Sequence, residues 1–274
     1  MTTVALRADL PPAAGRAGFG GALRSEWTKL VSLRSTVATL LSTMAVTIGL
    51  SALVAWGASN RLHHVGRIPE SFDAVQASMF GLIFGQLVIA VIGAMTITGE
   101  YSTGMIRTSL AAAPRRLVTL AAKLTVFAGA ALLTGLVCAF ASFFIGQHFY
   151  ASLHISVGLG EPNVLRAVVG GALFLTVAGL LSFGLGTILR HTAGAITAAV
   201  GILFISFILF QFLPSDWAEH AQRWIPFFAG SSIWSTQPDP EAHVWGPWAE
   251  FAVFSGYALV ALAVGAIMFR RRDA

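Results

Sequence analysis

The acidic residue Glu100 occupies an unusual place, at the end of a long apolar run. Residues 74–99 contain no Asp, Glu, Lys or Arg, and Glu100 follows them directly. A carboxylate at this point can pair with a base or accept backbone hydrogen bonds at the start of a helix. The bases nearest to it in the following segment are Arg107, Arg115 and Arg116. As an interfacial ion pair it would contribute about 1 kcal/mol or less to stability, so we expect its role to be functional.

The sequence lacks the residues that bind and hydrolyse ATP. A Walker A loop requires Gly-Lys followed by Ser or Thr. The two lysines of the chain are Lys29, in WTKL, and Lys123, in AAKL, and neither fits this motif. The chain itself is therefore expected to have no ATPase activity and to carry no cofactor.

Metal-dependent and serine-protease chemistry are also disfavoured. A metal site needs clustered histidine and carboxylate ligands, and the sequence has no His-Glu-x-x-His motif. Six of the seven histidines fall in the loops that we assign below to the outside, and His191 falls inside. Ser231 and Ser232 have no histidine partner in any expected span. We therefore expect no catalytic residue and no metal site on the chain.

The composition requires a membrane. The chain has 274 residues, of which 56% are apolar and 11% charged, against about 25% charged in an ordinary soluble domain. A membrane helix needs about 20 apolar residues, and six stretches are long enough. The expected spans are residues 35–60, 74–99, 120–147, 167–189, 192–213 and 250–269. The short gap at Arg190 makes spans four and five a hairpin. The sequence thus predicts an all-α polytopic membrane protein.

The basic residues orient these spans, because cytoplasmic loops carry an excess of Lys and Arg. With the N-terminus inside, 13 of the 17 basic residues are cytoplasmic, and eight of the 12 acidic residues are outside. Residues 98–123 and 190–193 are then inside, and 60–73, 148–166 and 214–248 outside. Both termini are expected in the cytoplasm, at the inner membrane. This distribution assigns the net charge of +5 to membrane lipid and not to nucleic acid.

The N-terminal region is not expected to be a signal peptide, because charged residues interrupt residues 1–34 and no apolar core region is present. Residues 1–22 are expected to be a flexible tail. The segment Leu23–Arg34 predicts a helix in the cytoplasmic interface with Trp27 at headgroup depth. Its apolar residues at helical spacing are Leu23, Trp27, Leu30 and Val31. Its other candidate residues are Glu26, Lys29 and Arg34. The alternative is a basic flank that only orients the first span.

Two motifs resemble the permease subunits of type-2 ATP-binding cassette (ABC) exporters, especially those of actinobacteria. They are SEWTKLVSLRST near the N-terminus and ITGEYSTGMIRTSLAAAPRR after the second span. With the six-span plan, the resemblance covers residues 23–274 as one transmembrane domain. It implies that Leu23–Arg34 is an elbow helix and that a coupling helix follows span two and docks on a separate ATP-binding subunit. The coupling residues would be Glu100, Tyr101, Ser102, Thr103, Arg107, Pro114, Arg115 and Arg116.

The resemblance also places spans two and five at the axis of a dimer, where they would line a transport path. The candidate path residues are Phe80, Phe84, Gln86, Phe204, Phe207 and Gln211. A phenylalanine stripe more often faces lipid or packs internally than contacts a substrate. Gln86 and Gln211 need hydrogen-bond partners if they are buried, and they could simply bridge neighbouring helices.

The outer connection of residues 214–248 holds five of the seven tryptophans. Its centre, WIPFFAGSSIW at 224–234, is apolar but interrupted by Pro226 and Gly230. This pattern suits short re-entrant helices before the last span. An aromatic belt at the membrane surface is the alternative.

These expectations combine into one functional hypothesis. The chain would be a permease subunit that exports a hydrophobic or amphipathic molecule, such as a drug, an antibiotic or a lipid. Two copies of a separate subunit would supply ATP and Mg, and a second permease chain would complete the pathway. A carrier or channel of another class is the alternative, although no span holds a charged residue in its middle, as ion-coupled carriers usually do. An intramembrane enzyme is the weakest interpretation.

Overall fold

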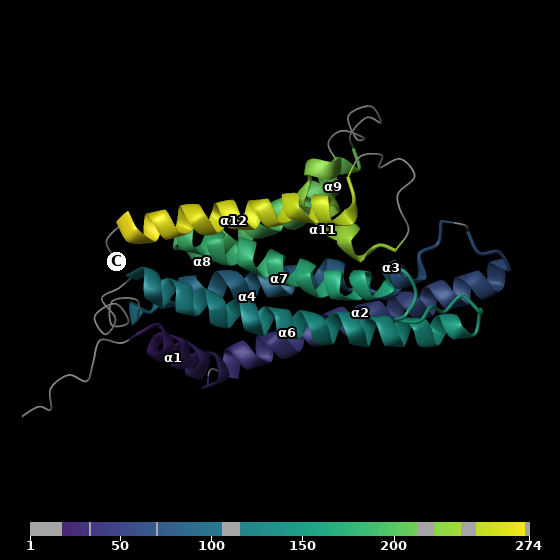
Figure 1. Ribbon diagram of the computed structural model, residues 1–274, viewed down its shortest axis with the longest axis horizontal. Coiled ribbons are helices and arrows are strands. Elements are labelled where there is room, and N and C mark those ends of the chain that lie inside the picture. The colour runs from purple at the N-terminus through teal and green to yellow at the C-terminus, as the bar shows by residue number, and fades with distance from the viewer. Residues whose placement is uncertain are drawn as a thin grey trace, which may run out of the picture.

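The computed structural model describes residues 18–32, 34–69, 71–105, 116–212, 222–236 and 245–271. Within these ranges the regular structure is entirely helical. Six helical segments there are long and apolar enough to cross a membrane, which confirms the predicted number of spans. They are α2 (Arg34–Val65), α4 (Leu82–Ser102), α6 (Arg116–Ala151), α7 (Val164–Leu189), the segment Thr192–Phe210 and α12 (Pro247–Arg271). Figure 1 shows the long helices running side by side along the molecule.

Helix α7 is the centre of the bundle. It is apolar around its whole circumference, as expected for a helix covered on all sides, and it packs against α4, α6 and α12. Glycines allow close approach of the backbones. A Cβ atom added to Gly93 of α4 would lie 2.3 Å from the carbonyl oxygen of Gly179 in α7. This contact fixes how tightly α4 and α7 pack.

The second span is shorter than predicted. Residues 74–81 do not belong to α4: α3 (Ala74–Ser78) precedes it, with a break at Met79–Gly81. The reason lies in α2, where Ser51 Oγ accepts a hydrogen bond from Gly81 N–H at 2.9 Å. A Cβ atom on Gly81 would lie 2.0 Å from the Thr47 carbonyl oxygen, so the chain can cross α2 here only at a glycine.

The fifth span is irregular. It consists of α8 (Thr192–Val200), the π-helical segment η1 (Gly201–Ile205) and α9 (Ser206–Phe210). The predicted hairpin before it is confirmed, because Arg190 ends α7 in the left-handed conformation, with φ of 55°, and His191 caps α8. Sequence periodicity did not predict the π-helical turn.

Other boundaries also differ from those predicted. Helix α1 (Phe19–Ser32) begins within the segment expected to be a flexible tail, and α6 begins before residue 120. The short helices predicted before the last span are present as α11 (Pro226–Ser231) and η3 (Ser232–Trp234), with η2 (Gln222–Trp224) before them. The rest of the predicted tail and most of the predicted coupling helix lie outside the described residues.

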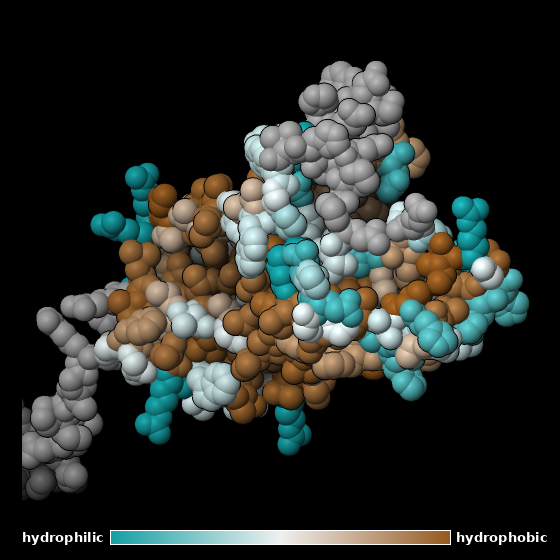
Figure 2. Space-filling view, turned by 45° about the vertical axis from the view of Figure 1, so that its right-hand side comes forward, coloured by the Kyte–Doolittle hydropathy of each residue, from teal (hydrophilic) through white to brown (hydrophobic). Residues whose placement is uncertain are grey.

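The ends of the helices gather at the two ends of the bundle. Helix α1, the beginning of α6 and the end of α12 lie at one end, on the left in Figure 1, and α3 lies toward the other. The surface between the ends is extensively apolar (Figure 2), and it includes Leu53, Leu133 and Leu259. Such a surface is typical of helices surrounded by lipid. We name the α1 end the inner end and the α3 end the outer end.

Candidate functional site

Four charged side chains form a closed ring at the inner end. Lys29 Nζ lies 2.8 Å from Glu26 Oε1 and 3.0 Å from Glu100 Oε1. Lys123 Nζ lies 2.6 Å from Glu26 Oε2 and 2.7 Å from Glu100 Oε1. Each carboxylate therefore contacts both ammonium groups, and the charges alternate around the ring. We call these four residues the ion-pair ring.

The ion-pair ring joins three helices. Glu26 and Lys29 lie one turn apart on α1, Glu100 lies in the last turn of α4, and Lys123 lies two turns inside α6. Glu26 is buried, whereas Trp27 is 51% exposed. Helix α1 therefore turns its charged face toward the bundle, and an apolar residue points away from it. This arrangement is typical of a helix that rests against lipid.

Three members of the ion-pair ring are buried, so the loss of any one of them leaves a buried charge without its partner. The side chains of Lys123, Glu26 and Glu100 are 5%, 7% and 8% exposed, and that of Lys29 is 28% exposed. Removing one member of a buried ion pair typically costs about 3–5 kcal/mol, because the remaining charge loses its partner. This cost of removal is a different quantity from the net contribution of an interfacial pair, about 1 kcal/mol or less, that the sequence suggested for Glu100.

The pKa of the Lys29 ammonium is raised above its ordinary value. Burial alone would lower this pKa, but hydrogen bonds to Glu26 and Glu100, together with their negative charges, outweigh the burial. Lys29 is therefore charged at every physiological pH. It is also the ring member most accessible to solvent.

The bases that pair with Glu100 are not those nearest in sequence. Lys29 and Lys123 lie 71 and 23 residues away from Glu100, and the sequence did not single them out as its partners. Arg116 begins α6, and the other arginines and the proline predicted to belong to the coupling region lie outside the described residues. The second oxygen of Glu100, Oε2, is buried and accepts no hydrogen bond from the described residues.

The other predicted coupling residues are held locally. The hydroxyls of Ser102 and Thr103 donate to the Gly99 carbonyl at 3.0 and 2.8 Å. The Tyr101 ring lies under the guanidinium of Arg190, with 5.0 Å from Cζ to the ring centroid. Tyr101 thus connects the end of α4 to the turn that follows α7. In the predicted elbow segment, Arg34 is exposed and begins α2.

The predicted path residues are only partly brought together. The ring centroids of Phe84 and Phe204 are 6.4 Å apart, Phe80 stacks beside Phe84, and Phe207 contacts Phe204. Gln86 is buried, and its Nε2 donates to the Ile83 carbonyl. Gln211 is exposed at the end of α9, so it is not the buried amide that the sequence suggested.

Sequence reasoning did not bring Glu26 and Lys123 into one site with Glu100. A signal was present in the composition, because both lysines of a chain with 17 basic residues belong to the ring. An ammonium is compact and can contact two carboxylates at once, whereas a guanidinium is a planar fork. The presence of two lysines among so many arginines could have indicated that both positions require an ammonium that contacts two carboxylates.

The chain matches no known family model and no curated protein sequence. Among the described residues, no group of three or more His, Cys, Asp or Glu side chains could hold a metal ion. The chain's own residues are therefore the basis on which its function is inferred.

Proposed function

We propose that the chain is the membrane-spanning subunit of an ATP-driven exporter and that the ion-pair ring couples it to a separate ATP-binding subunit. The observation that carries the proposal is the position of Glu100 and Lys123. They lie on the two helices that the segment 103–115 connects, and they contact each other at 2.7 Å. The ring therefore fastens both ends of that segment to one point.

This geometry suits the transmission of a movement. A force applied to the connection between α4 and α6 acts on the ion-pair ring, and through it on α1 as well. Because the ring is buried, its geometry is well defined and its members move together. The buried Oε2 atom of Glu100 supplies a further acceptor for a donor that approaches from this connection. These properties support the coupling role that the sequence motifs suggest.

The proposed orientation places the inner end in the cytoplasm. The basic residues of the sequence favour this side, and an ATP-binding subunit would have access to ATP only there. A second permease chain would pair along the face where Phe80, just before α4, and Phe84 and Met95 of α4 are exposed. The aromatic character of this face supports a hydrophobic or amphipathic substrate.

Purification from the native membrane, followed by reconstitution into vesicles, tests the proposal. We expect an ATP-binding subunit to copurify in equal numbers, and a lipophilic dye inside right-side-out vesicles to be exported only when ATP and Mg are supplied to that subunit. The matched control carries an ATP-binding subunit without its Walker A lysine. Transport that follows an imposed proton or sodium gradient, and is unaffected by ATP, would favour a secondary carrier instead.

A further inference from the structure

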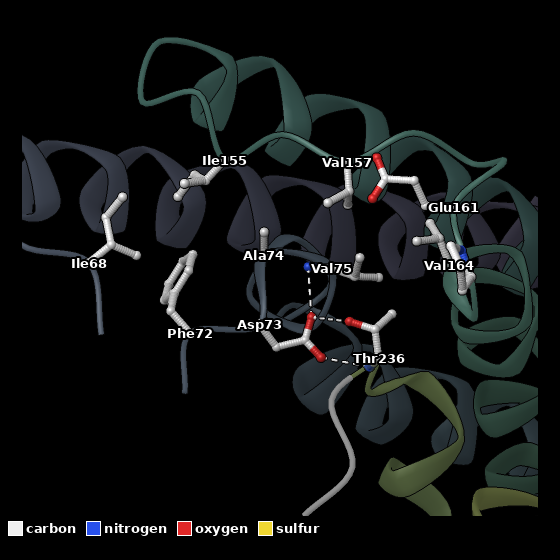
Figure 3. Close-up of a pocket in the computed structure, with 11 residues that line it drawn as sticks. Ile68, Phe72, Asp73, Ala74, Val75, Ile155, Val157, Glu161, Val164 and Thr236 are labelled. Carbon is white, nitrogen blue, oxygen red and sulfur yellow. Dashed lines mark hydrogen bonds between the residues drawn. The ribbon is translucent and has the colours of Figure 1, made fainter. Parts of the chain in front are cut away.

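Asp73, at the outer end, uses both carboxylate oxygens to hold two separate parts of the chain (Figure 3). Oδ1 accepts hydrogen bonds from the N–H groups of Val75 and Gln76, both at 2.9 Å, and so caps α3. The same oxygen accepts the hydroxyl of Thr236 at 2.9 Å, and Oδ2 accepts the Thr236 N–H at 2.6 Å. The Ser235 hydroxyl also donates to Oδ2, at 3.2 Å. A residue before α4 is thus bonded to the residues that follow η3.

Arg166 holds the same segment through its backbone carbonyl groups. Its Nη1 donates to the carbonyl of Ile233 at 3.0 Å, and its Nη2 donates to that of Ser235 at 2.9 Å. Asp73 therefore accepts hydrogen bonds from the donors of this short segment, and Arg166 donates hydrogen bonds to its carbonyl oxygens. We call Asp73, Arg166 and residues 233–236 the outer clamp. Hydrogen bonds to charged groups are stronger than those between neutral groups.

The segment held by the outer clamp carries the short helix α11. Phe227 and Phe228 of α11 pack on Phe207 and Phe210 of α9, with centroid distances of 4.6 and 4.5 Å respectively. Ala229 is fully buried in α11. α11 and η3 thus pack against α9, α7 and α12, whereas Asp73 ties this unit to the connection between α2 and α4.

A cavity lies beside the outer clamp. It has a volume of about 270 Å³, and Asp73 and Thr236 form part of its wall. Ile68, Phe72, Ile155 and Val157 line other parts of it (Figure 3). The two chain segments are therefore not packed tightly against each other around the clamp. Polar bonds make a large contribution to holding them together.

We propose that Asp73 is a positioning residue that closes the outer end of the transport path, and that the release of residues 235 and 236 from it opens that end. The proposal rests on the exporter function proposed above. When the bonds from Ser235 and Thr236 to both oxygens of Asp73 break, α11 and η3 remain attached to α7 and α12 but separate from α3. The inner ion-pair ring and the outer clamp would then act at opposite ends of the same bundle.

The variant Asp73→Asn distinguishes the two roles of Asp73, which are to cap α3 and to hold residues 235 and 236. Asparagine is as good a helix N-cap as aspartate, so α3 is retained when the amide oxygen takes the place of Oδ1. The amide nitrogen then faces the Thr236 N–H, and two donors oppose each other. Thr236→Val is a milder variant that removes only the hydroxyl bond to Oδ1. Glu161→Gln is the matched control, because Glu161 lines the same cavity but, among the described residues, accepts a hydrogen bond from the Gly158 N–H of its own turn and none from residues 233–236.

The reporter is a cysteine at Ala229 in a Cys138→Ala background, labelled by a membrane-impermeant maleimide from outside. Loss of hydrogen bonds to a charged group predicts a labelling rate about tenfold higher with Asp73→Asn. Thr236→Val should give a smaller increase, and Glu161→Gln none. A second reporter at Ala167, buried near the start of α7, should stay protected in every variant.

Two results would overturn the clamp. One is a cysteine at Ala229 that stays protected from labelling in folded Asp73→Asn protein. If Asp73→Asn does not fold, the same result in Thr236→Val would overturn the clamp. The other is equal labelling at Ala167 and Ala229, which would mean general loosening. In the assembled complex, a non-hydrolysable ATP analogue should change labelling at Ala229 when Asp73 is present. If the analogue leaves labelling at Ala229 unchanged, the opening step alone is overturned. The absence of ATP-driven export would instead overturn the proposed function.

Discussion

Lys123 Nζ on α6 lies 2.6 Å from Glu26 Oε2 on α1, although 97 residues separate the two in the sequence. The contact brings the segment before the first span against the beginning of the third. Because Lys123 also contacts Glu100, the three helices at the inner end share one charged centre.

Removal of the Lys123 ammonium should destabilise the protein severely. In Lys123→Met the carboxylates of Glu26 and Glu100 lose their best-buried partner, and we expect the free energy of unfolding to fall by about 3–5 kcal/mol. Reversible unfolding in detergent measures this loss. Arg24→Met is the control, since Arg24 is exposed on α1 and its loss should change stability by about 0.5 kcal/mol or less. Equal stability of the two variants would show that the ring does not stabilise the bundle.

Charge-balanced double variants should separate coupling from folding. Glu100→Gln with Lys29→Met keeps the Glu26–Lys123 pair but detaches α4 from the ion-pair ring. Glu26→Gln with Lys29→Met keeps the Glu100–Lys123 pair and detaches α1 instead. Each double variant removes one acid and one base and leaves one intact ion pair with no net charge. We therefore expect both complexes to assemble.

We expect the variant that detaches α4 to lose most ATP-driven transport and most stimulation of the ATPase, about tenfold or more. The variant that detaches α1 should retain coupling, because the link between α4 and α6 is intact. Transport and ATPase rates in the same vesicles provide the comparison. Full transport by an assembled complex that carries Glu100→Gln and Lys29→Met would refute the coupling role of Glu100.

Stability should fall at alkaline pH because of Lys29. Its pKa is raised in the folded protein, so its contribution is complete below its unfolded pKa, about 10.4, and is lost as pH rises through the higher folded value. Thermal unfolding between pH 7 and pH 11.5 should show a decline that begins above about pH 10. The decline should be smaller in Lys29→Met, and an identical pH profile in that variant would contradict the assignment.

The proposed orientation in the membrane predicts which introduced cysteines react from outside. In a Cys138→Ala background, Gln237→Cys should be labelled by an impermeant thiol reagent on intact cells. Ser109→Cys should react only after the cells are opened, because the basic residues place its segment inside. Strong labelling at residue 109 and none at residue 237 would reverse the topology.

Close packing of α4 and α7 predicts opposite results for two glycines of one helix. Gly93→Ala should destabilise the bundle by about 1–3 kcal/mol, because the added methyl group would lie 2.3 Å from the Gly179 carbonyl oxygen. Gly99→Ala should be neutral or slightly stabilising, since nothing lies within 4 Å of its Cβ position. Unfolding in detergent compares the two. A Gly93→Ala protein as stable as Gly99→Ala would show that this contact can relax without cost.

The parts of the fold that depend on local composition were predictable. A run of apolar residues must form a hydrogen-bonded helix in lipid, so the six spans could be counted from the sequence. Boundaries were less reliable where another helix decides them. Gly81 ends the break before α4 because α2 crosses it there, and no local pattern marks Thr47 and Ser51 as the residues it meets.

The candidate site was predictable only in part, for the same reason. Glu100 stood out because of its place in the sequence, yet its partners Lys29 and Lys123 come from helices that the sequence did not connect with it. The π-helical turn in the fifth span and the exposure of Gln211 were not foreseen either. They depend on how α8 and α9 meet α7 and α11, which helical periodicity does not report.

The sequence by itself determined the six helices, among the described residues, that are long and apolar enough to cross a membrane, because the scarcity of charge along each stretch is a local property that favours a helix in lipid. It also placed the functional signals in the segment around Glu100. Only the tertiary structure decided that Lys29 and Lys123 close a ring with Glu26 and Glu100, and that Asp73 and Arg166 hold residues 233–236. Charges far apart in sequence meet only when helix packing sets their distance, and an ion pair is strong only where that packing also excludes water.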